Sequence, residues 1–308
     1  MRDWMLLAEA RLDLSVGRPG DERQALIALV RSSRGLGLGA TERWALALLA
    51  SGKLLEGDRE GARVDLDRVA ELEVGERGLF HADIDRAHAW LAAERAGLPT
   101  AREMLRVAAD DAQRLGKSSM EAALLHDIAR FGDADSVAGR LVQLAEVGQG
   151  SFLRARAAHA SGIASGDPAL LDRAAALFEQ CGFSLLAAEA RLDQADALAR
   201  RGDQRGATAA RNRSAAIRRL LPPTVVTPTL ARSLSLEPLS EREHEVALLA
   251  AQGLSSRDIA SRLFVSTRTI DNHLQHVYSK LGVNGRDQLV AALRAESSAL
   301  PGDERDPR

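Results

Sequence analysis

The sequence predicts an all-α fold, in which paired helices stack into a solenoid and a small, separate helical domain follows. Of the 308 residues, 45% are hydrophobic but only 3% are aromatic, and the apolar residues are mostly Ala and Leu. Both favour helices, and Ala at a contact lets two helix axes approach closely. A glycine that recurs at a regular interval and a single proline-rich break are the other two indications.

A glycine, often followed by aspartate, separates successive amphipathic stretches in the first 220 residues. These glycines lie 34 to 40 residues apart, which is the period of helix-pair solenoids. Glycine suits the left-handed position that ends a helix, and the aspartate can begin the next helix. The positions are Gly17, Gly57-Asp58, Gly97, Gly132-Asp133, Gly166-Asp167 and Gly202-Asp203.

The stretch after Gly97 shows the helical period clearly. Its apolar stripe consists of Ala101, Leu105, Ala108, Ala112 and Leu115. A stripe of this kind on each pair must be covered, so neighbouring pairs are expected to stack. Residues 1–220 resemble tetratricopeptide-like (TPR-like) repeats, although they lack a clean copy of the Trp/Leu/Gly/Tyr consensus. An irregular helical bundle is the alternative interpretation.

Two segments are predicted to lie outside the folded domains. Pro222, Pro223 and Pro228 cannot continue a helix, so residues 221–236 are predicted to be a linker. Residues 297–308 contain two prolines and a Gly-Asp-Glu-Arg-Asp run, which is typical of a disordered tail. The remaining segment, residues 237–296, forms the predicted second domain.

This second domain has the pattern of a helix-turn-helix. A capping box at Ser240–Glu243 begins one helix, and Ser255 begins another. After a three-residue turn, Ser266 caps a third helix that runs to about Leu281, and a fourth helix follows Gly282. Two short helices, a tight turn and a longer helix form the arrangement that places a recognition helix in the DNA major groove.

The individual residues carry a more specific resemblance. The anchors are Leu239-Ser240-Glu241-Arg242-Glu243, Gly253-Leu254-Ser255, Ile259-Ala260, Val265-Ser266, Thr269-Ile270, His273, Lys280-Leu281 and Val283. Through them, residues 237–296 resemble, without gaps, the C-terminal domain of LuxR-type (LuxR/FixJ-like) regulators. The resemblance implies a four-helix DNA-binding domain. With its helical repeats, the chain resembles the C-terminal part of the large ATP-binding LuxR regulators.

The predicted third helix has an apolar and a polar face. The apolar face consists of Ile270, Leu274, Val277 and Leu281. The polar face consists of Arg268, Asn272, Gln275 and Ser279, flanked by Asp271 and His276. Asn and Gln side chains can bind adenine through two hydrogen bonds, and Arg can bind guanine or phosphate. An ordinary solvated face is the alternative, and the family resemblance favours the DNA-reading one.

The resemblance also implies roles for individual residues. Asp271, Asn272 and Gln275 occupy positions that most often touch base edges in the family. Phosphate contacts are implied for Thr269, His276 and Lys280, and for the start of the second helix at Ser255, Ser256 and Arg257, where amides and the helix dipole favour an anion. His273 matches a histidine that packs beneath the recognition helix or contacts DNA.

Two departures from the family bear on affinity. Many relatives have Lys where this chain has Asp271, which could accept a hydrogen bond from cytosine or repel the wrong partner. Residues 239–296 also contain seven Arg and Lys against seven Asp and Glu, so the domain is formally neutral. A single domain should therefore bind DNA weakly. Dimerisation would double the contacts, and the resemblance places Leu289 and Leu293 at the dimer surface.

Enzymatic and metal chemistry are not expected. Gly116-Lys117-Ser118 lacks the earlier glycine of a nucleotide-binding loop, because Asp111 stands in its place. His81, Asp85 and His88 could share a helix face but have no further ligand nearby in sequence, so a solvated face is expected. The single cysteine excludes an internal disulfide. We expect no catalytic residues, no metal and no cofactor.

These observations predict a cytoplasmic transcription regulator. No run of apolar residues is long enough to span a membrane, and no signal peptide is expected. The expected partners are double-stranded DNA, a second copy of the chain, a protein or small-molecule inducer at the repeats, and RNA polymerase. The alternative is a protein-interaction scaffold whose C-terminal domain serves dimerisation, which the neutral charge and Asp271 favour.

Overall fold

The computed structural model describes residues 2–72, 81–148, 150–235 and 239–281, together with Val283, Gly285, Arg286, Leu289 and Leu293. Sixteen helices and no strand occur in these described ranges, so the all-α prediction is confirmed. The chain divides into two compact units, Met1–Thr229 and Leu230–Arg308.

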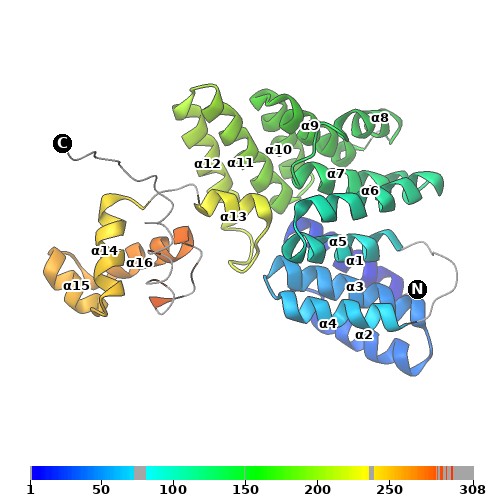
Figure 1. The fold of residues 1–308 in the computed structure, drawn as a ribbon, viewed down its shortest axis with the longest axis horizontal. Coiled ribbons are helices and arrows are strands. Elements are labelled where there is room, and N and C mark those ends of the chain that lie inside the picture. Colours follow the sequence, from blue (N-terminus) through cyan, green and yellow to red (C-terminus); the bar gives the residue numbers. More distant parts are fainter. Residues whose placement is uncertain are drawn as a thin grey trace, which may run out of the picture. The chain divides into compact units, whose positions relative to one another are not determined.

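The N-terminal unit contains twelve helices within its described residues, arranged as six consecutive pairs (Figure 1). The first three pairs are α1 (Arg2–Val16) with α2 (Arg23–Gly35), α3 (Gly39–Leu55) with α4 (Arg59–Glu71), and α5 (His81–Arg95) with α6 (Leu98–Arg114). The other three are α7 (Ser118–Arg130) with α8 (Ala138–Gly148), α9 (Ser151–Ser165) with α10 (Pro168–Gln180), and α11 (Ser184–Arg200) with α12 (Gln204–Arg218). Every glycine of the predicted repeat falls between the two helices of one pair.

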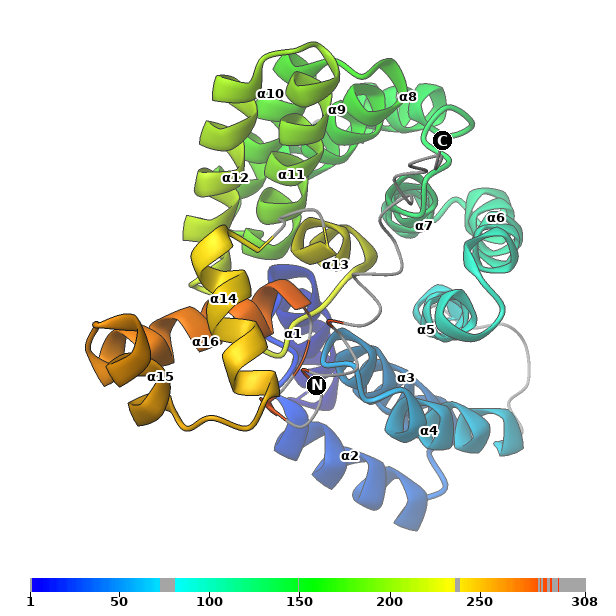
Figure 2. The ribbon, with the colours of Figure 1, turned by 60° about the vertical axis from the view of Figure 1, so that its left-hand side comes forward.

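The pairs curve into a superhelix that turns back on itself. Figure 2 shows the odd-numbered helices on the inner side of this curve and the even-numbered helices on the outer side. Contacts run in order from α1 through α3, α5 and α7 to α9, and α11 contacts both α10 and α1. A solenoid was predicted, and the return of α11 to α1 is a feature that the repeat period does not reveal. The resemblance to TPR-like repeats stays a prediction.

Gly17 allows the two ends of this curve to meet. It follows α1 and has a φ of +96°. A side-chain Cβ at this position would lie 2.9 Å from the Leu221 Cδ2 atom and 3.0 Å from the Leu185 Cβ atom. Only glycine combines this backbone conformation with so close an approach. Gly17 therefore permits the end of α1 to pack on the start of α11.

The predicted role of the Gly-Asp pairs is confirmed at three of the turns, including the one at Gly166-Asp167. Gly57 and Gly202 have φ values of +79° and +84°, which suit glycine after a helix. Asp58 and Asp203 are the N-caps of α4 and α12, and each accepts a hydrogen bond from the amide three residues ahead, at 2.9 and 2.8 Å. One dipeptide thus ends a helix and begins its partner.

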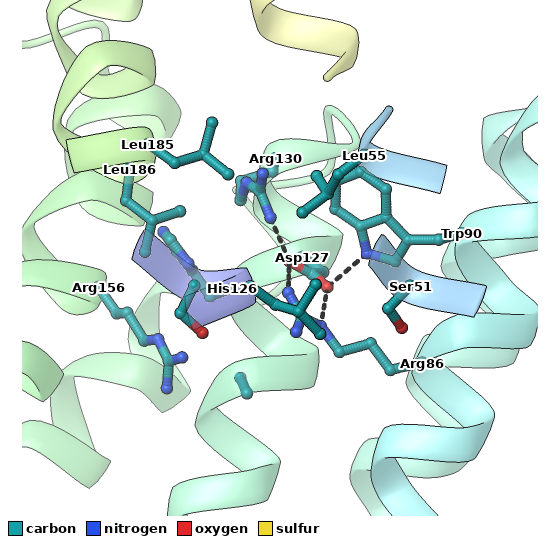
Figure 3. Close-up of a pocket in the computed structure, with 13 residues that line it drawn as sticks. Ser51, Leu55, Arg86, Trp90, His126, Asp127, Arg130, Arg156, Leu185 and Leu186 are labelled. Carbon is teal, nitrogen blue, oxygen red and sulfur yellow. Dashed lines mark hydrogen bonds and ion pairs between the residues drawn. The ribbon is translucent and has the colours of Figure 1, made fainter. Parts of the chain in front are cut away.

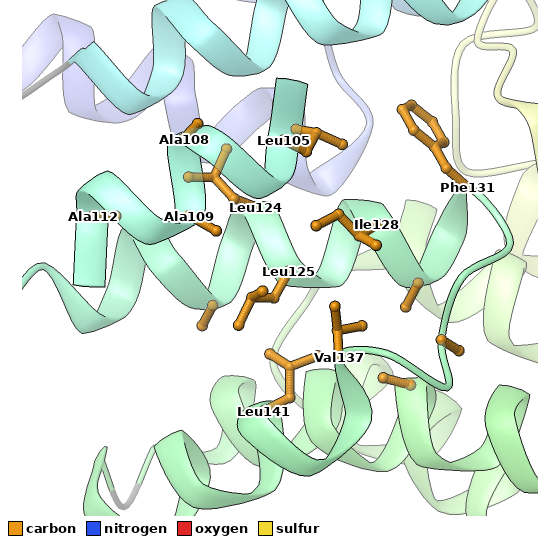
Figure 4. Packing of buried hydrophobic residues seen from close by; sticks show 14 of the residues in the cluster. Leu105, Ala108, Ala109, Ala112, Leu124, Leu125, Ile128, Phe131, Val137 and Leu141 are labelled. Atoms are coloured by element: carbon orange, nitrogen blue, oxygen red, sulfur yellow. The ribbon is translucent and has the colours of Figure 1, made fainter. Parts of the chain in front are cut away.

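Small and medium apolar side chains pack between α6, α7 and α8 (Figure 4). The predicted stripe is buried at Ala101, Leu105, Ala108 and Ala112, none more than 3% exposed. Burying a leucine fully contributes roughly 1.5–3 kcal/mol. The last predicted member, Leu115, is 57% exposed, because α6 ends at Arg114 and the chain turns away there.

The predicted linker contains ordered structure. The helix before it does end close to residue 220, as α12 stops at Arg218. Leu221 and Val225 are nevertheless buried, and the Val226 amide donates a hydrogen bond to the Leu55 carbonyl (2.7 Å). A short helix, α13 (Pro228–Ser235), then begins with a proline, which is acceptable in a first helical turn. Residues 221–226 therefore pack on the repeats rather than bridging open space.

The C-terminal unit contains α14 (Glu241–Ala251), α15 (Ser256–Leu263) and α16 (Thr267–Leu281). These bounds match the three helices predicted around the helix-turn-helix. The predicted fourth helix lies mostly outside the described residues, although Leu289 and Leu293 are helical. The predicted tail, residues 297–308, also lies outside them.

Candidate nucleic-acid interface

The three described helices of the C-terminal unit pack around one apolar core. Each of α14, α15 and α16 contacts the other two. The core includes Val246, Ile259, Ile270, Leu274 and Val277, each at most 4% exposed. Because the apolar side of α16 is held in this core, its opposite side must face outward.

A capping box positions the start of α15. The Ser255 hydroxyl accepts a hydrogen bond from the Asp258 amide (3.2 Å), and the Asp258 carboxylate accepts from the Ser255 hydroxyl (2.6 Å) and amide (3.3 Å). These hydrogen bonds keep the pKa of Asp258 below its ordinary value. Such a box satisfies amides that the first turn of a helix leaves free. The predicted start of the second helix is confirmed.

The turn between α15 and α16 redirects the chain sharply. Phe264 has a φ of +55°, a left-handed conformation that is uncommon for a residue other than glycine. Its side chain is 95% exposed, and the next amide, of Val265, donates to the Ala260 carbonyl (3.1 Å). The Ser266 hydroxyl then accepts from the Thr269 amide (3.1 Å), which confirms Ser266 as the cap of α16.

The exposed side of α16 carries polar side chains at positions named for DNA reading. Four of these are exposed: Arg268, Asp271, Asn272 and Gln275. The two predicted faces are therefore confirmed at the described positions, whereas the side chains of Ser279, His276 and Leu281 lie outside the described part. We call these four residues the reading face. That they contact DNA stays a prediction.

The implied phosphate-contacting residues of α16 differ in their surroundings. Thr269 is half-buried, and its hydroxyl lies 2.7 Å from the Ser266 hydroxyl. His276 and Lys280 lie within α16, but their side chains are outside the described part. His273 is half-buried, which agrees with packing beneath the helix. Thr269 therefore has a hydrogen-bond partner within the domain, and its contact with a DNA phosphate stays a prediction.

The start of α15 gains a basic residue that the sequence reasoning missed. Ser255 and Arg257 are exposed there, and Ser256 is half-buried. Arg286 donates a hydrogen bond to the Ser256 hydroxyl (2.9 Å) and another to the Leu254 carbonyl. Thirty residues separate Arg286 from Ser256, so no local pattern could have revealed the contact. The helix dipole, Arg257 and Arg286 together make this end electropositive.

Leu289 and Leu293, which the resemblance placed at a dimer surface, are buried within their own domain. Their exposed fractions are 0% and 7%, and both belong to the core that includes Val246 and Ile259. In the single chain these leucines therefore stabilise the helix-turn-helix. A dimer surface on the helix that carries them stays a prediction.

The other motifs noted in the sequence lie on or next to helices α5, α6 and α7. His81 lies 3.5 Å from Asp85, but among the described side chains no group of three or more His, Cys, Asp or Glu residues is placed to hold a metal ion. Within the same ranges, no helix is both long enough and apolar enough to cross a membrane. Gly116 and Lys117 lie in the turn between α6 and α7, and Ser118 is the first residue of α7.

The C-terminal unit is similar to several known proteins. Residues 237–293 match the family described as bacterial regulatory proteins, luxR family. Over 55 residues the chain is 46% identical to the spore germination protein GerE of Bacillus subtilis, covering 18% of this chain and 74% of GerE. Over 52 residues it is 42% identical to the oxygen regulatory protein NreC of Staphylococcus aureus, covering 17% of this chain and 24% of NreC.

A third relative is much longer than the matched segment. Over 62 residues the chain is 53% identical to a protein of Mycobacterium tuberculosis named as an HTH-type transcriptional regulator. The match covers 20% of this chain and only 7% of the mycobacterial protein. No solved structure matches the chain.

Proposed function

Since this chain belongs, through its C-terminal domain, to the luxR family of bacterial regulatory proteins, we propose that it regulates transcription by binding promoter DNA. The observation that carries the proposal is the reading face. Arg268, Asp271, Asn272 and Gln275 are exposed along α16, while its other side is held in the core. A helix fixed in this way can enter the major groove and present side chains to base edges.

Within this proposal the two ends of the helix-turn-helix have different tasks. The reading face selects sequence, while the start of α15 holds the DNA backbone through Ser255, Ser256 and Arg257. The helix dipole and the first-turn amides that the capping box does not bind favour phosphate there, and the nearby Arg286 adds charge. Phosphate contacts position a protein on the duplex but carry no sequence information.

We further propose that the protein acts as a homodimer in the cytoplasm. The C-terminal domain is formally neutral, so a single copy gains little from counterion release. Two copies would read two half-sites with twice the contacts. The helical repeats would respond to a signal or protein partner and thereby bring two DNA-binding domains together, with RNA polymerase as a further partner. No enzymatic activity is part of this proposal.

The test begins with the sites that the full chain occupies across a genome. Binding to a recovered site is then measured by electrophoretic mobility for the full chain and for the double variant Asn272→Ala/Gln275→Ala. Each two-point base contact contributes about 1–3 kcal/mol of discrimination, so we expect affinity to fall at least about 10-fold. Gln113→Ala, which removes an exposed amide from α6 in the other unit, is the matched control.

Both side chains are exposed, so the double variant should keep its fold. Unchanged affinity and unchanged sequence preference would rule out the reading face. The second candidate, a protein-interaction scaffold, is favoured by the neutral domain and by Asp271. It predicts that the full chain binds no duplex DNA at any salt concentration, and such a result would replace the regulatory proposal.

A further inference from the structure

The inner helices of the N-terminal unit surround a cavity (Figure 3). Side chains of α1, α3, α5, α7, α9 and α11 all contribute to its wall. The room that it leaves for water-sized molecules is about 40 Å³, and the cavity is partly open to solvent, so a bound molecule must be small or extend through the opening. Its apolar wall includes Leu14, Leu55, Trp90, Leu185 and Leu186.

A balanced group of charges occupies one side of this cavity. Asp127 accepts hydrogen bonds from Arg86 Nε (2.5 Å), Trp90 Nε1 (2.7 Å) and Arg130 Nη1 (2.6 Å), and Figure 3 shows the three donors converging on it. Arg130 also donates to both carboxylate oxygens of Glu189, at 2.7 and 2.8 Å. Two arginines thus offset two carboxylates, and this network needs no further ion.

Arg156, from α9, stands apart from this network. Its Nε is buried without an acceptor, and no hydrogen bond or ion pair of Arg156 occurs among the described residues. Its guanidinium lies over the Phe152 ring, 4.1 Å from the centroid. Burial and the nearby Arg86 lower the pKa of Arg156 to about 9, so it is still charged at neutral pH. The Arg156 side chain is half-buried, so its charge keeps some contact with water, and a counter-ion would stabilise it further.

The histidine in the cavity wall does not change this charge balance. His126 Nε2 lies 3.0 Å from His159 Nδ1, and His159 Nε2 lies 3.0 Å from Asp193 Oδ2. Burial, and then the neighbouring His159, lower the pKa of His126 well below its ordinary value. His126 is therefore uncharged at neutral pH. Among the residues that the structure describes, the cavity wall is left with one cation without an acidic partner, Arg156, beside an apolar wall.

We propose that this cavity binds a small organic monocarboxylate, whose carboxylate pairs with Arg156 while its apolar part lies against Leu185 and Leu186. A single negative charge completes the balance, and guanidinium groups bind carboxylates through paired, charge-assisted hydrogen bonds. The inference rests on the proposed sensing role of the repeats, because it names the chemical class of their signal. The ligand site lies wholly within the N-terminal unit and can be tested without DNA.

The test is calorimetric titration of the full chain with sodium hexanoate and sodium benzoate at constant ionic strength. Saturable binding is expected for these carboxylates, and none for the uncharged hexanamide and benzamide. Arg156→Gln should weaken carboxylate binding at least about 10-fold, since a hydrogen bond to a charged group is lost. Arg154→Gln is the matched control, because Arg154 lies on the same helix but is exposed.

Thermal unfolding without ligand shows whether the Arg156→Gln variant loses binding merely because it has lost its folded structure. Because Arg156→Gln removes an unpaired charge, its melting temperature should equal or exceed that of the wild type. No saturable binding of either carboxylate, equal binding of the amides, or undiminished binding by a folded Arg156→Gln protein would each overturn the inference. DNA binding measured on the same samples separates the outcomes: intact DNA binding without carboxylate binding removes only this inference.

Discussion

Asp127 shows how a single residue organises the centre of the repeat unit. Its side chain is 1% exposed and accepts hydrogen bonds from two arginines and a tryptophan that belong to α5 and α7. Burial disfavours the charged carboxylate, but Arg86 and Arg130 outweigh that effect and lower the pKa of Asp127 far below its ordinary value. The carboxylate therefore stays ionised and links α5 to α7.

Replacing Asp127 with Asn should destabilise the protein strongly. Removing one partner of a buried ion pair leaves uncompensated charges and costs about 3–5 kcal/mol. We expect a loss of this size in the free energy of unfolding of the N-terminal unit, measured by urea denaturation. Asp110→Asn, an exposed carboxylate on α6, is the control and should change little. A loss below 1 kcal/mol for Asp127→Asn would contradict the role of the network.

The stabilisation of the folded state by Asp127 depends on pH. The pKa of Asp127 is lowered in the folded state, so its stabilising effect is complete at neutral pH. The effect diminishes as the pH falls below about 5 towards the folded-state pKa. The difference in unfolding free energy between wild type and Asp127→Asn should accordingly be smaller at pH 3.5 than at pH 7.

Among the elements, the helices could be predicted from the sequence, but the contact between the last helix pair and the first could not. Periodic apolar residues and the glycines predicted all six pairs, and the capping residues Ser240, Ser255 and Ser266 predicted where the C-terminal helices begin. Local patterns cannot show contacts between distant segments, which is why the return of α11 to α1 and the bond from Arg286 to Ser256 were missed. The inward-facing Arg156 was equally invisible, because charged residues at helix positions usually face solvent.

The start of α15 allows a test of one element's role. Arg257→Ala removes an exposed charge from the predicted phosphate-binding end. We expect weaker binding to specific and non-specific DNA alike, and a slope of log affinity against log salt that is shallower by about one. Fluorescence anisotropy at several salt concentrations measures both quantities. Arg205→Ala, an exposed arginine of α12, should leave the slope unchanged.

A loss confined to the specific site would contradict the positioning role of Arg257. It would show instead that Arg257 reads a base. An unchanged salt slope would remove Arg257 from the interface altogether.

At the scale of the whole molecule, the two units divide the proposed work. The C-terminal unit shares its helix-turn-helix with the luxR family, and this resemblance was legible in the sequence because the anchors lie close together. The N-terminal unit contributes a cavity whose walls come from six helices spread over residues 14–186. These residues are far apart in the sequence, so only the folded structure shows that they surround one cavity. In the proposed function, a signal that binds in the cavity changes how two DNA-binding domains come together.

The proposed function requires that the full chain binds DNA with sequence specificity. This is tested by comparing its affinity for a genomically recovered site with its affinity for a scrambled duplex of equal length and composition, at physiological salt, by fluorescence anisotropy. We expect the recovered site to bind at least about 1,000-fold more tightly, as specific DNA-binding proteins do. Equal affinity for the two duplexes, or no binding to either, would contradict the proposed function.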